Sequence, residues 1–404
     1  MKNCDVIIAG GCSAGLAAAI GAKRLHPGLD IAVLEKNQRA GKKILATGNG
    51  KCNITNLGAL SHPYRNADFT QHAMGKYNPQ VVIEFFASMG LLCYADSEGR
   101  VYPRSNTASS VLDALRFEAE KLGVEIVTET PVTNVTAKNG RFYVNGNYSC
   151  EKLILACGGK ASPSQGSDGS GYPLAKMLGH TVTRLYPALV PLSVKDEITK
   201  SLKGIRARSV KLTLDDGCVL QESCGEILFA DHGLSGIAAM ELAANAEKSL
   251  AEGKIPLVHI DFAPDMTESD IMAYLVQVKK IHSARTADIL LGGLLPKAVG
   301  IALCKECGIG CSDKPVSALT EEELHVVAVK VKDFTLTVKG TKGYANAQVT
   351  SGGIPVNEID PSTMQSLVCP NLYFAGEIVD VHGGCGGFNL QWAWASGLLA
   401  GELK

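Results

Sequence analysis

The chain has 404 residues, of which 46% are hydrophobic, and a formal net charge of −1. This length provides for two or three domains with a sizeable core, and the near-neutral charge excludes a global basic footprint for nucleic acid. No apolar run reaches the roughly 20 residues that span a bilayer, and no secretory signal precedes the first strand. We therefore expect a cytoplasmic protein without a membrane partner. The odd number of 13 cysteines predicts reduced thiols rather than a disulfide framework.

The N-terminal segment predicts a strand, a tight glycine turn and a helix. Residues 5–15 read DVIIAGGCSAG, an Ala-rich stretch follows, and residues 31–35 read IAVLE. Such a β-α-β unit over residues 4–36 binds a dinucleotide, because the helix N-terminus faces the pyrophosphate and Glu35 can take the ribose hydroxyls. Cys12 stands where the motif has its second glycine. We expect altered packing there rather than loss of the cofactor.

The next segments predict a ligand-binding loop and a mixture of helices and strands. Residues 41–56 (GKKILATGNGKCNITN) supply glycines, amides and small polar groups, as a loop along a flat polar ligand needs. Apolar periodicity predicts helices at 78–90, 107–122 and 171–180, the first two with Asn78 and Thr107 as N-caps. Short strands follow Gly123 and end in a buried strand that returns to the nucleotide-binding sheet; these runs are VEIVTE, VTNVTAK, RFYVNG and KLILACGG.

From about residue 193 the pattern changes. Strand-like runs precede a helical stretch from about 267 to 325, and strands are expected again over residues 327–340 (VAVKVKDFTLTVKG). The glycine-rich pattern returns only after Ala345. We interpret residues 193–344 as an insertion and predict three domains: a nucleotide-binding domain (1–192 and 345–404), a β-rich domain (193–266 and 326–344) and a helical subdomain (267–325).

Two local patterns suggest partners, and both have a simpler explanation. Residues 195–211 carry six Lys or Arg residues, but acidic residues outnumber basic ones over 193–345, which favours a solvated hairpin and argues against a nucleic-acid partner. Cys304, Cys307 and Cys311 have a spacing that suits part of a metal or iron–sulfur site. No fourth ligand is evident and the run ends an apolar helix, so we predict helix packing and no metal.

Four segments together resemble one family. GKKILATGNGKCNITN, LILACGGKASPSQGSDGSGY, GEILFADHGLSG and LYFAGEIVDVHGGCGGFNLQWAWASG look like the aminoacetone-oxidase-type FAD-binding flavoproteins, which are similar to bacterial bile-acid (3-dehydro bile acid) reductases. The resemblance covers almost the whole chain. It implies an α/β fold in which a two-dinucleotide-binding-type FAD domain carries an inserted β-barrel-like body and a helical subdomain.

The resemblance also implies which residues bind FAD. They form the pyrophosphate turn, the ribose-binding acid, the loop along the flavin, the second FAD motif and the turn that opens the last helix: Gly10, Gly11, Cys12, Ser13, Ala14, Gly15, Glu35, Lys36, Lys43, Thr47, Gly48, Gly50, Cys52, Asn53, Val132, Ala156, Cys157, Gly158, Gly376, Glu377, Asp380, Gly386, Gly387, Phe388 and Asn389. A helix beginning near Asn389 would aim its positive end at the flavin pyrimidine and stabilise the anionic reduced form.

The expected function is an FAD-dependent reductase that acts on a conjugated C=C bond of a small apolar, steroid- or bile-acid-like substrate. Hydride would leave flavin N5 while His382, which we expect to titrate near neutral pH, or Cys52 protonates the other carbon. A second dinucleotide fingerprint is absent from the sequence, so NAD(P)H would bind transiently or another donor would reduce the flavin. The family's activities leave three alternatives open: uridine reduction in ribosomal RNA, amine oxidation, and a flavin-binding redox sensor with little turnover. Nothing in the sequence selects an oligomeric state.

Overall fold

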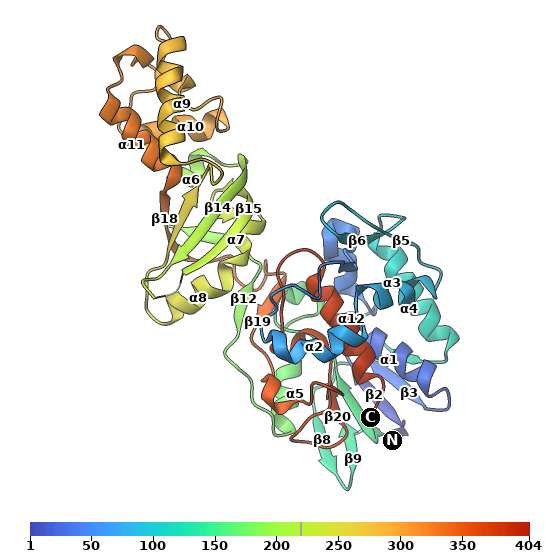
Figure 1. The fold of residues 1–404 in the computed structure, drawn as a ribbon. Helices are drawn as coiled ribbons and strands as arrows, with labels where there is room; N and C mark the ends of the chain where they lie inside the picture. Colours follow the sequence, from blue (N-terminus) through green and yellow to red (C-terminus); the bar gives the residue numbers. More distant parts are fainter. Residues whose placement is uncertain (219) are drawn as a thin grey trace. The chain divides into compact units, whose positions relative to one another are not determined.

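The computed structural model describes residues 1–218 and 220–404 and divides them into two compact units (Figure 1). Unit 1 comprises residues 1–186 and 348–404, and unit 2 comprises residues 187–347. The division into three domains expected from the sequence stays a prediction. Among the described residues, no helix has both the length and the apolar character needed to cross a bilayer.

A parallel sheet forms the centre of unit 1. Its strand order is β20-β11-β2-β3-β7, which are Leu372–Phe374, Lys152–Leu155, Val6–Ala9, Ile31–Leu34 and Glu125–Val127. β2 and β3 are apolar throughout and fully buried, as strands covered on both faces must be. The expected α/β, Rossmann-type fold is therefore confirmed, and so is the return of residues 152–155 to this sheet.

Two helices pack closely beside this sheet. The first helix α1 (Ser13–Leu25) lies against the last helix α12 (Phe388–Ala400), although they come from opposite ends of the chain (Figure 1). Glycines of α12 allow the approach, because a Cβ at Gly397 would lie 2.4 Å from the backbone oxygen of Ala14. Trp392 and Trp394 anchor α12 in the core. The N- and C-terminal segments of the chain thus build one site region.

The other elements of unit 1 surround this centre. One small sheet has the order β1-β10-β9-β8 and another the order β4-β6-β5. The bounds are β1 Lys2–Asn3, β4 Thr55–Asn56, β5 Cys93–Ala95, β6 Arg100–Pro103, β8 Val135–Lys138, β9 Arg141–Val144, β10 Tyr148–Cys150, β12 Tyr186–Ala188, β19 Val349–Ser351, α2 Ala67–Lys76, α3 Pro79–Ala87, α4 Ala108–Lys121 and α5 Gly171–Met177, with 3-10 turns η1 Lys42–Gly50, η2 Pro163–Gln165, η5 Val356–Glu358 and η6 Gly376–Ile378.

The predicted helices of unit 1 are confirmed, and Asn78 and Thr107 are the N-cap residues of α3 and α4. The Asn78 side chain accepts hydrogen bonds from the backbone of Gln80 and Val81 at the start of α3. Thr107 makes no side-chain hydrogen bond to the helix backbone, and its hydroxyl contacts the hydroxyls of Ser105 and Ser110 instead.

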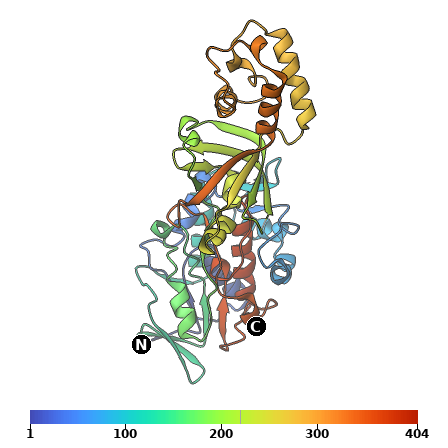
Figure 2. The same ribbon diagram turned by 90° about the vertical axis from the view of Figure 1, so that its left-hand side faces the viewer.

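Unit 2 contains a closed barrel and a group of helices. The barrel order is β13-β16-β15-β14-β17-β18, which are Leu192–Val194, Gly233–Ser235, Leu220–Ala230, Arg206–Asp215, Leu257–Asp261 and Phe334–Thr341. Helices α9 (Glu268–Ile281), α10 (Lys297–Glu306) and α11 (Glu321–Lys332) gather at one end of it (Figure 2). The remaining bounds are α6 Ile198–Ser201, α7 Ile237–Glu241, α8 Ala243–Ala251, η3 Ala287–Ile289 and η4 Val316–Ala318.

One expected strand of unit 2 is wrong. Residues 327–332 were expected to continue the β-rich body, but they form the second half of α11. The hydroxyl of Thr320 and the carboxylate of Glu323 form a capping box that starts this helix. Leu324, Val327, Ala328 and Val331 then place one buried face at helical spacing. The β-branched valines suggested a strand, and packing overrode that propensity.

Candidate functional site

The glycine turn between β2 and α1 has the geometry that its motif requires. Gly10 has φ +105°, and a Cβ there would lie 2.5 Å from the backbone oxygen of Ala156. A Cβ at Gly15 would lie 1.9 Å from the oxygen of Gly10. Cys12 is the N-cap of α1 in an extended conformation, with Ser13 and Ala14 beginning the helix. The first and third glycines are therefore required by close backbone contacts, and the turn forms with Cys12 in the second position.

Glu35 follows β3 and is held beside this turn. Its Oε2 accepts the Gly11 amide at 2.9 Å, and its Oε1 accepts the backbone and side-chain nitrogens of Asn37 at 2.8 and 2.7 Å. The backbone oxygen of Glu35 accepts the amide of Thr130, two residues before the half-buried Val132. Oε1 already accepts two bonds, whereas Oε2 accepts one and has further acceptor capacity. The buried acid is therefore oriented and able to accept ribose hydroxyls.

The carboxyl end of β11 lies against the same turn. The amide of Ala156 and the thiol of Cys157 both donate to the backbone oxygen of Ala9, at 2.9 and 3.3 Å. Burial raises the pKa of Cys157 to about 12, so this thiol stays protonated. Gly158 follows with φ +72°. Lys36, by contrast, pairs with Asp168 at 2.6 Å, so its charge is already matched.

The loop after β3 is tied to the second FAD motif. Lys43 donates to the carboxylate of Glu377 at 2.9 Å and to the backbone oxygen of Ala161 at 3.2 Å. The Thr47 hydroxyl turns back to the oxygen of Ile44. Gly48 and Gly50 take positive φ of +55° and +83°. The structure thus brings Lys43 and Glu377 together.

The segment 53–55 lies along the first turns of α12. The indole Nε1 of Trp394 donates to the oxygen of Ile54 at 2.9 Å, and the Thr55 hydroxyl donates to Gln391 at 2.5 Å. A Cβ at Gly387 would lie 2.7 Å from Asn53 Oδ1. Within the described residues, this buried oxygen has no hydrogen-bond partner. An N–H donor from a flat heterocycle such as isoalloxazine satisfies an oxygen of this kind, so the residues fit FAD.

The two acids of the second FAD motif have different surroundings. Asp380 is nearly buried and accepts two bonds from the Arg65 guanidinium, at 2.6 and 3.1 Å, and one from Thr183 at 3.3 Å. Glu377 accepts from Lys43 and from the amide of Thr350, and it is more exposed. A Cβ at Gly376 would touch Ala14, which joins this motif to α1. Glu377 is thus the more accessible of the two acids, whereas Asp380 is held by the internal pair with Arg65.

The turn before α12 is held by its own side chains. Asn389 donates from Nδ2 to the oxygens of Gly383 and Gly384, each at 3.0 Å, and accepts the Gly383 amide at 2.9 Å. Asn56 donates to the oxygen of Gly386 at 3.0 Å. Gly387 is the N-cap of α12 with φ +96°. Asn389 therefore shapes the turn.

The two candidate proton donors are both neutral at pH 7. Burial, together with the charge of Arg65, lowers the pKa of His382 to about 4, so the expectation that it titrates near neutral pH is wrong. Its Nδ1 is buried and, in the described part of the chain, lacks a hydrogen-bond partner. Cys52 is fully buried with φ +59°, and burial raises its pKa to about 12. A role in proton transfer stays a prediction for both.

Sequence reasoning missed His62 and Arg65. Arg65 binds Asp380 through its side chain, and its amide donates to the oxygen of His382 at 2.9 Å. His62 accepts the Gly384 amide and stacks on Phe388. Neither belongs to a recognised motif. The local signal is an aromatic and basic cluster, HPYR, in the loop between β4 and α2.

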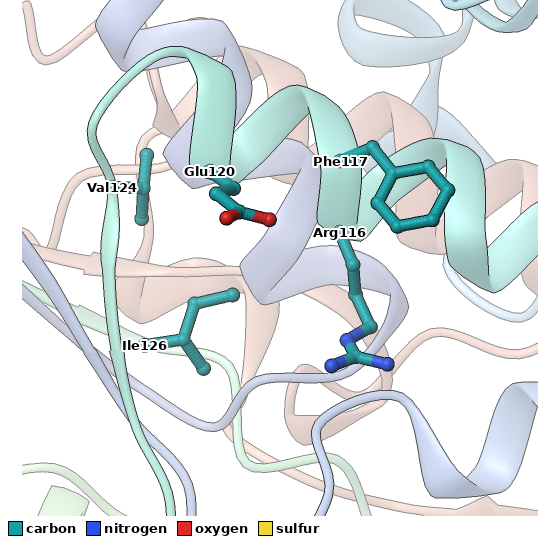
Figure 3. Close-up of a pocket in the computed structure, with 5 residues that line it drawn as sticks. All are labelled: Arg116, Phe117, Glu120, Val124 and Ile126. Carbon is teal, nitrogen blue, oxygen red and sulfur yellow. The ribbon is translucent and has the colours of Figure 1, made fainter.

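A surface hollow of about 260 Å³ lies apart from these motifs. It is formed by α4 and the segment leading into β7, and Figure 3 shows Val124 and Ile126 facing the helix that carries its other lining residues. Those are Arg116, Phe117 and Glu120. None of them belongs to a glycine motif, so we do not assign the substrate to this hollow.

The three cysteines at and after the end of α10 make packing contacts: Cys304 and Cys311 are buried and Cys307 is half-buried. Cys307 and Cys311 donate weakly to the backbone oxygens of Val326 and Ile301, at 3.8 and 3.7 Å. Burial raises the pKa of all three thiols, Cys304 included. Over residues 1–218 and 220–404, no three His, Cys, Asp or Glu side chains group to hold a metal. The expected absence of a metal stays a prediction.

Comparison with known proteins adds the relatives of this chain. The protein is 38% identical over 401 residues to the 3-dehydro-bile acid delta(4,6)-reductase of Clostridium scindens, covering 98% of this chain and 97% of that protein. It is 28% identical over 404 residues to the ribosomal RNA dihydrouridine synthase of Escherichia coli K12, covering 98% and 96%. A solved 3-ketosteroid delta1-dehydrogenase from Sterolibacterium denitrificans has a TM-score of 0.52 at 14% identity, covering 100% and 99%, which shows a shared fold.

The family assignment rests on the whole chain. The family described as HI0933-like protein Rossmann domain matches residues 4–403. The narrower aminoacetone-oxidase-type assignment stays a prediction, whereas the expected similarity to a bile-acid reductase is confirmed. The chain belongs to the HI0933-like family of Rossmann-domain proteins.

Proposed function

We propose that this protein reduces a conjugated C=C bond in an apolar, steroid-like substrate with the help of FAD. The chain is an FAD-dependent oxidoreductase, and the substrate class is the finer part of the proposal. The observation that carries it is the 38% identity, over 98% of the chain, to a 3-dehydro-bile acid delta(4,6)-reductase. That relative's name describes reduction of a conjugated ring system.

The FAD would be held by the turn at Gly10–Gly15, by Glu35 and by Glu377, with Asn53 Oδ1 accepting from the ring. When bound, it supplies the hydride for the electron-poor carbon. Lys43 neutralises the charge of Glu377 and fixes its carboxylate. The first turn of α12 would face the flavin, and the positive end of the helix would favour negative charge there.

His382 is our first choice for the proton-handling residue. Its Nδ1 is buried and without a partner among the described residues, so a substrate oxygen or an ordered water would complete it. Because its pKa is about 4, the ring is neutral at pH 7 and would donate an N–H hydrogen bond to a substrate oxygen rather than release a proton. Negative charge that develops on a substrate carbonyl would draw on this donor, and the proton that the second carbon takes up would come from solvent or from the Cys52 thiol. Cys52 is the second choice, because burial raises the pKa of its thiol to about 12.

Uridine reduction in ribosomal RNA is the alternative function. Two relatives that carry this name align over nearly the whole chain, at 28% and 29% identity. The basic run of unit 2 argues against RNA binding there, because five of its six cations are paired with acids at 2.5–3.5 Å: Lys200–Glu197, Lys203–Asp231, Arg206–Glu226, Arg208–Glu226 and Lys211–Glu222. Phosphate binding needs cations that are free to exchange their counterions. The steroid-like substrate is therefore favoured.

The test is anaerobic stopped-flow oxidation of the photoreduced, FAD-loaded protein. It would be mixed in turn with a 3-oxo steroid that carries a conjugated C=C bond, a uridine-containing ribosomal RNA fragment, and buffer. Rapid return of oxidised-flavin absorbance with the steroid alone, and a product heavier by two hydrogens, is expected. Reoxidation by RNA but not by the steroid would replace the proposal with its alternative. A parallel mixing of oxidised protein with NADH or NADPH tests the electron donor, and oxygen consumption with a small amine tests the oxidase function.

A further inference from the structure

His62 contacts the glycine turn that precedes α12. It lies in the loop between β4 and α2, and its Nε2 accepts the amide of Gly384 at 2.8 Å. Its ring is parallel to that of Phe388, with centroids 3.6 Å apart and an interplanar angle of 7°. One imidazole thus contacts both the turn and the first residue of the helix.

Closely packed neighbours surround the contact between His62 and the turn. A Cβ at Gly383 would lie 3.1 Å from His62 Cδ2 and 3.0 Å from Tyr64 Cε1. Tyr64 stands edge-on to the imidazole at 5.1 Å and donates from its hydroxyl to the oxygen of Phe388 at 3.1 Å. The loop and the turn are therefore packed in direct contact, and glycine at 383 is needed for their approach.

The hydrogen bond defines the state of the ring. A nitrogen that accepts an amide carries no proton, so the neutral imidazole has its hydrogen on Nδ1. Burial lowers the pKa of His62 to about 4, which keeps the ring neutral at pH 7. A phenyl ring could stack on Phe388 equally well. The acceptor nitrogen is the feature that a purely packing residue would not supply.

We propose that His62 is a positioning residue that fixes the turn of residues 383–387, and with it the first turn of α12, by accepting the Gly384 amide. The part that concerns the flavin rests on the proposed function, because α12 would face the FAD. Asn389 shapes the turn from within, and Asn56 and Arg65 tie its flanks. His62 is the tie at the Gly384 amide, whereas Asn389 holds the Gly384 oxygen.

The first experiment measures amide hydrogen exchange in FAD-free protein, on the peptide that carries residues 383–387. His62→Phe keeps the stacking and removes the acceptor, and His62→Gln offers an amide oxygen in its place. His72→Phe, at an exposed position of α2, is the matched control. We expect exchange of the Gly384 amide to be roughly tenfold faster in His62→Phe, as loss of one hydrogen bond predicts, and close to wild type in the other two. Unchanged exchange in His62→Phe overturns the proposal.

The second experiment measures the midpoint potential of bound flavin in the same variants. His62→Phe should shift it to a more negative value and His62→Gln should restore it, because a loosened helix start stabilises negative charge less well. If exchange quickens throughout unit 1 and His62→Gln does not rescue it, the role is only structural and the proposal fails. If no variant, wild type included, binds FAD, the proposed function fails, while the exchange result still decides whether His62 holds the turn.

Discussion

Gly15→Ala tests the physical basis of the dinucleotide turn. An added Cβ would lie 1.9 Å from the backbone oxygen of Gly10, whereas real Cβ contacts essentially never fall under 3.0 Å. The start of α1 and the turn must therefore move apart by about 1 Å to accommodate the added Cβ. Neither side of the contact is a flexible side chain, so the helix itself has to shift.

The size of the effect follows from that geometry. Overpacking of this kind costs about 1–3 kcal/mol, which for a unit of this size lowers the melting temperature by about 3–10 °C. Moving the N-terminus of α1 away from the pyrophosphate should also weaken FAD binding about tenfold, which corresponds to a loss of about 1.4 kcal/mol in binding free energy.

The assay combines thermal unfolding with titration of the FAD-free protein by FAD. Gly28→Ala is the control, because a Cβ there meets nothing within 4 Å. It should change the free energy of unfolding by less than about 1 kcal/mol and leave FAD affinity unchanged. If Gly15→Ala melts and binds FAD like wild type, the close contact does not hold the turn and the reasoning is refuted.

Four further predictions follow from the site. Arg65→Ala should lower the free energy of unfolding, measured in urea, by about 1–3 kcal/mol, because the nearly buried Asp380 carboxylate loses its partner. Adding Asp380→Asn should recover part of the lost stability. A double variant that is less stable than Arg65→Ala would contradict this explanation. His62 and His382 have folded pKa values of about 4, below their usual 6.5, so the stability that they contribute is complete above pH 6.5 and is lost as pH falls towards 4. In the wild type the free energy of unfolding should therefore fall between pH 7 and 4.5, and replacing both histidines by Phe should reduce this fall by about 1–3 kcal/mol. An unchanged dependence of the free energy of unfolding on pH would count against these pKa values. Acid precipitation should release FAD into the supernatant; flavin retained in the pellet, or FMN in its place, would be the contrary result. Elemental analysis should find no stoichiometric zinc or iron, and metal that is lost in Cys307→Ser would reverse the packing interpretation.

The fold was predictable where its cause is local. The glycines at 10 and 15 and the acid at 35 form a pattern whose spacing already contains the turn, the helix start and the end of the next strand. The buried strands β2 and β3 can be recognised in the sequence as unbroken apolar runs. The prediction failed for residues 327–332, because valine favours strands in isolation while the capping box at Thr320 and Glu323 commits the segment to a helix.

The site was less predictable because its contacts join residues that are far apart in the chain. Arg65 meets Asp380 across 315 positions, and His62 meets Gly384 across 322. The sequence marked Asp380 as an acid of the FAD motif, but only the fold shows that it pairs with Arg65, whereas the more exposed Glu377 pairs with Lys43. The same holds for charge: an exposed histidine at 382 would titrate near pH 6.5, and its burial beside Arg65 makes it a neutral donor instead. A motif therefore identifies the chemical groups at such a site. Their protonation and their remaining hydrogen-bonding capacity depend on partners that are distant in the sequence and cannot be predicted from motif spacing.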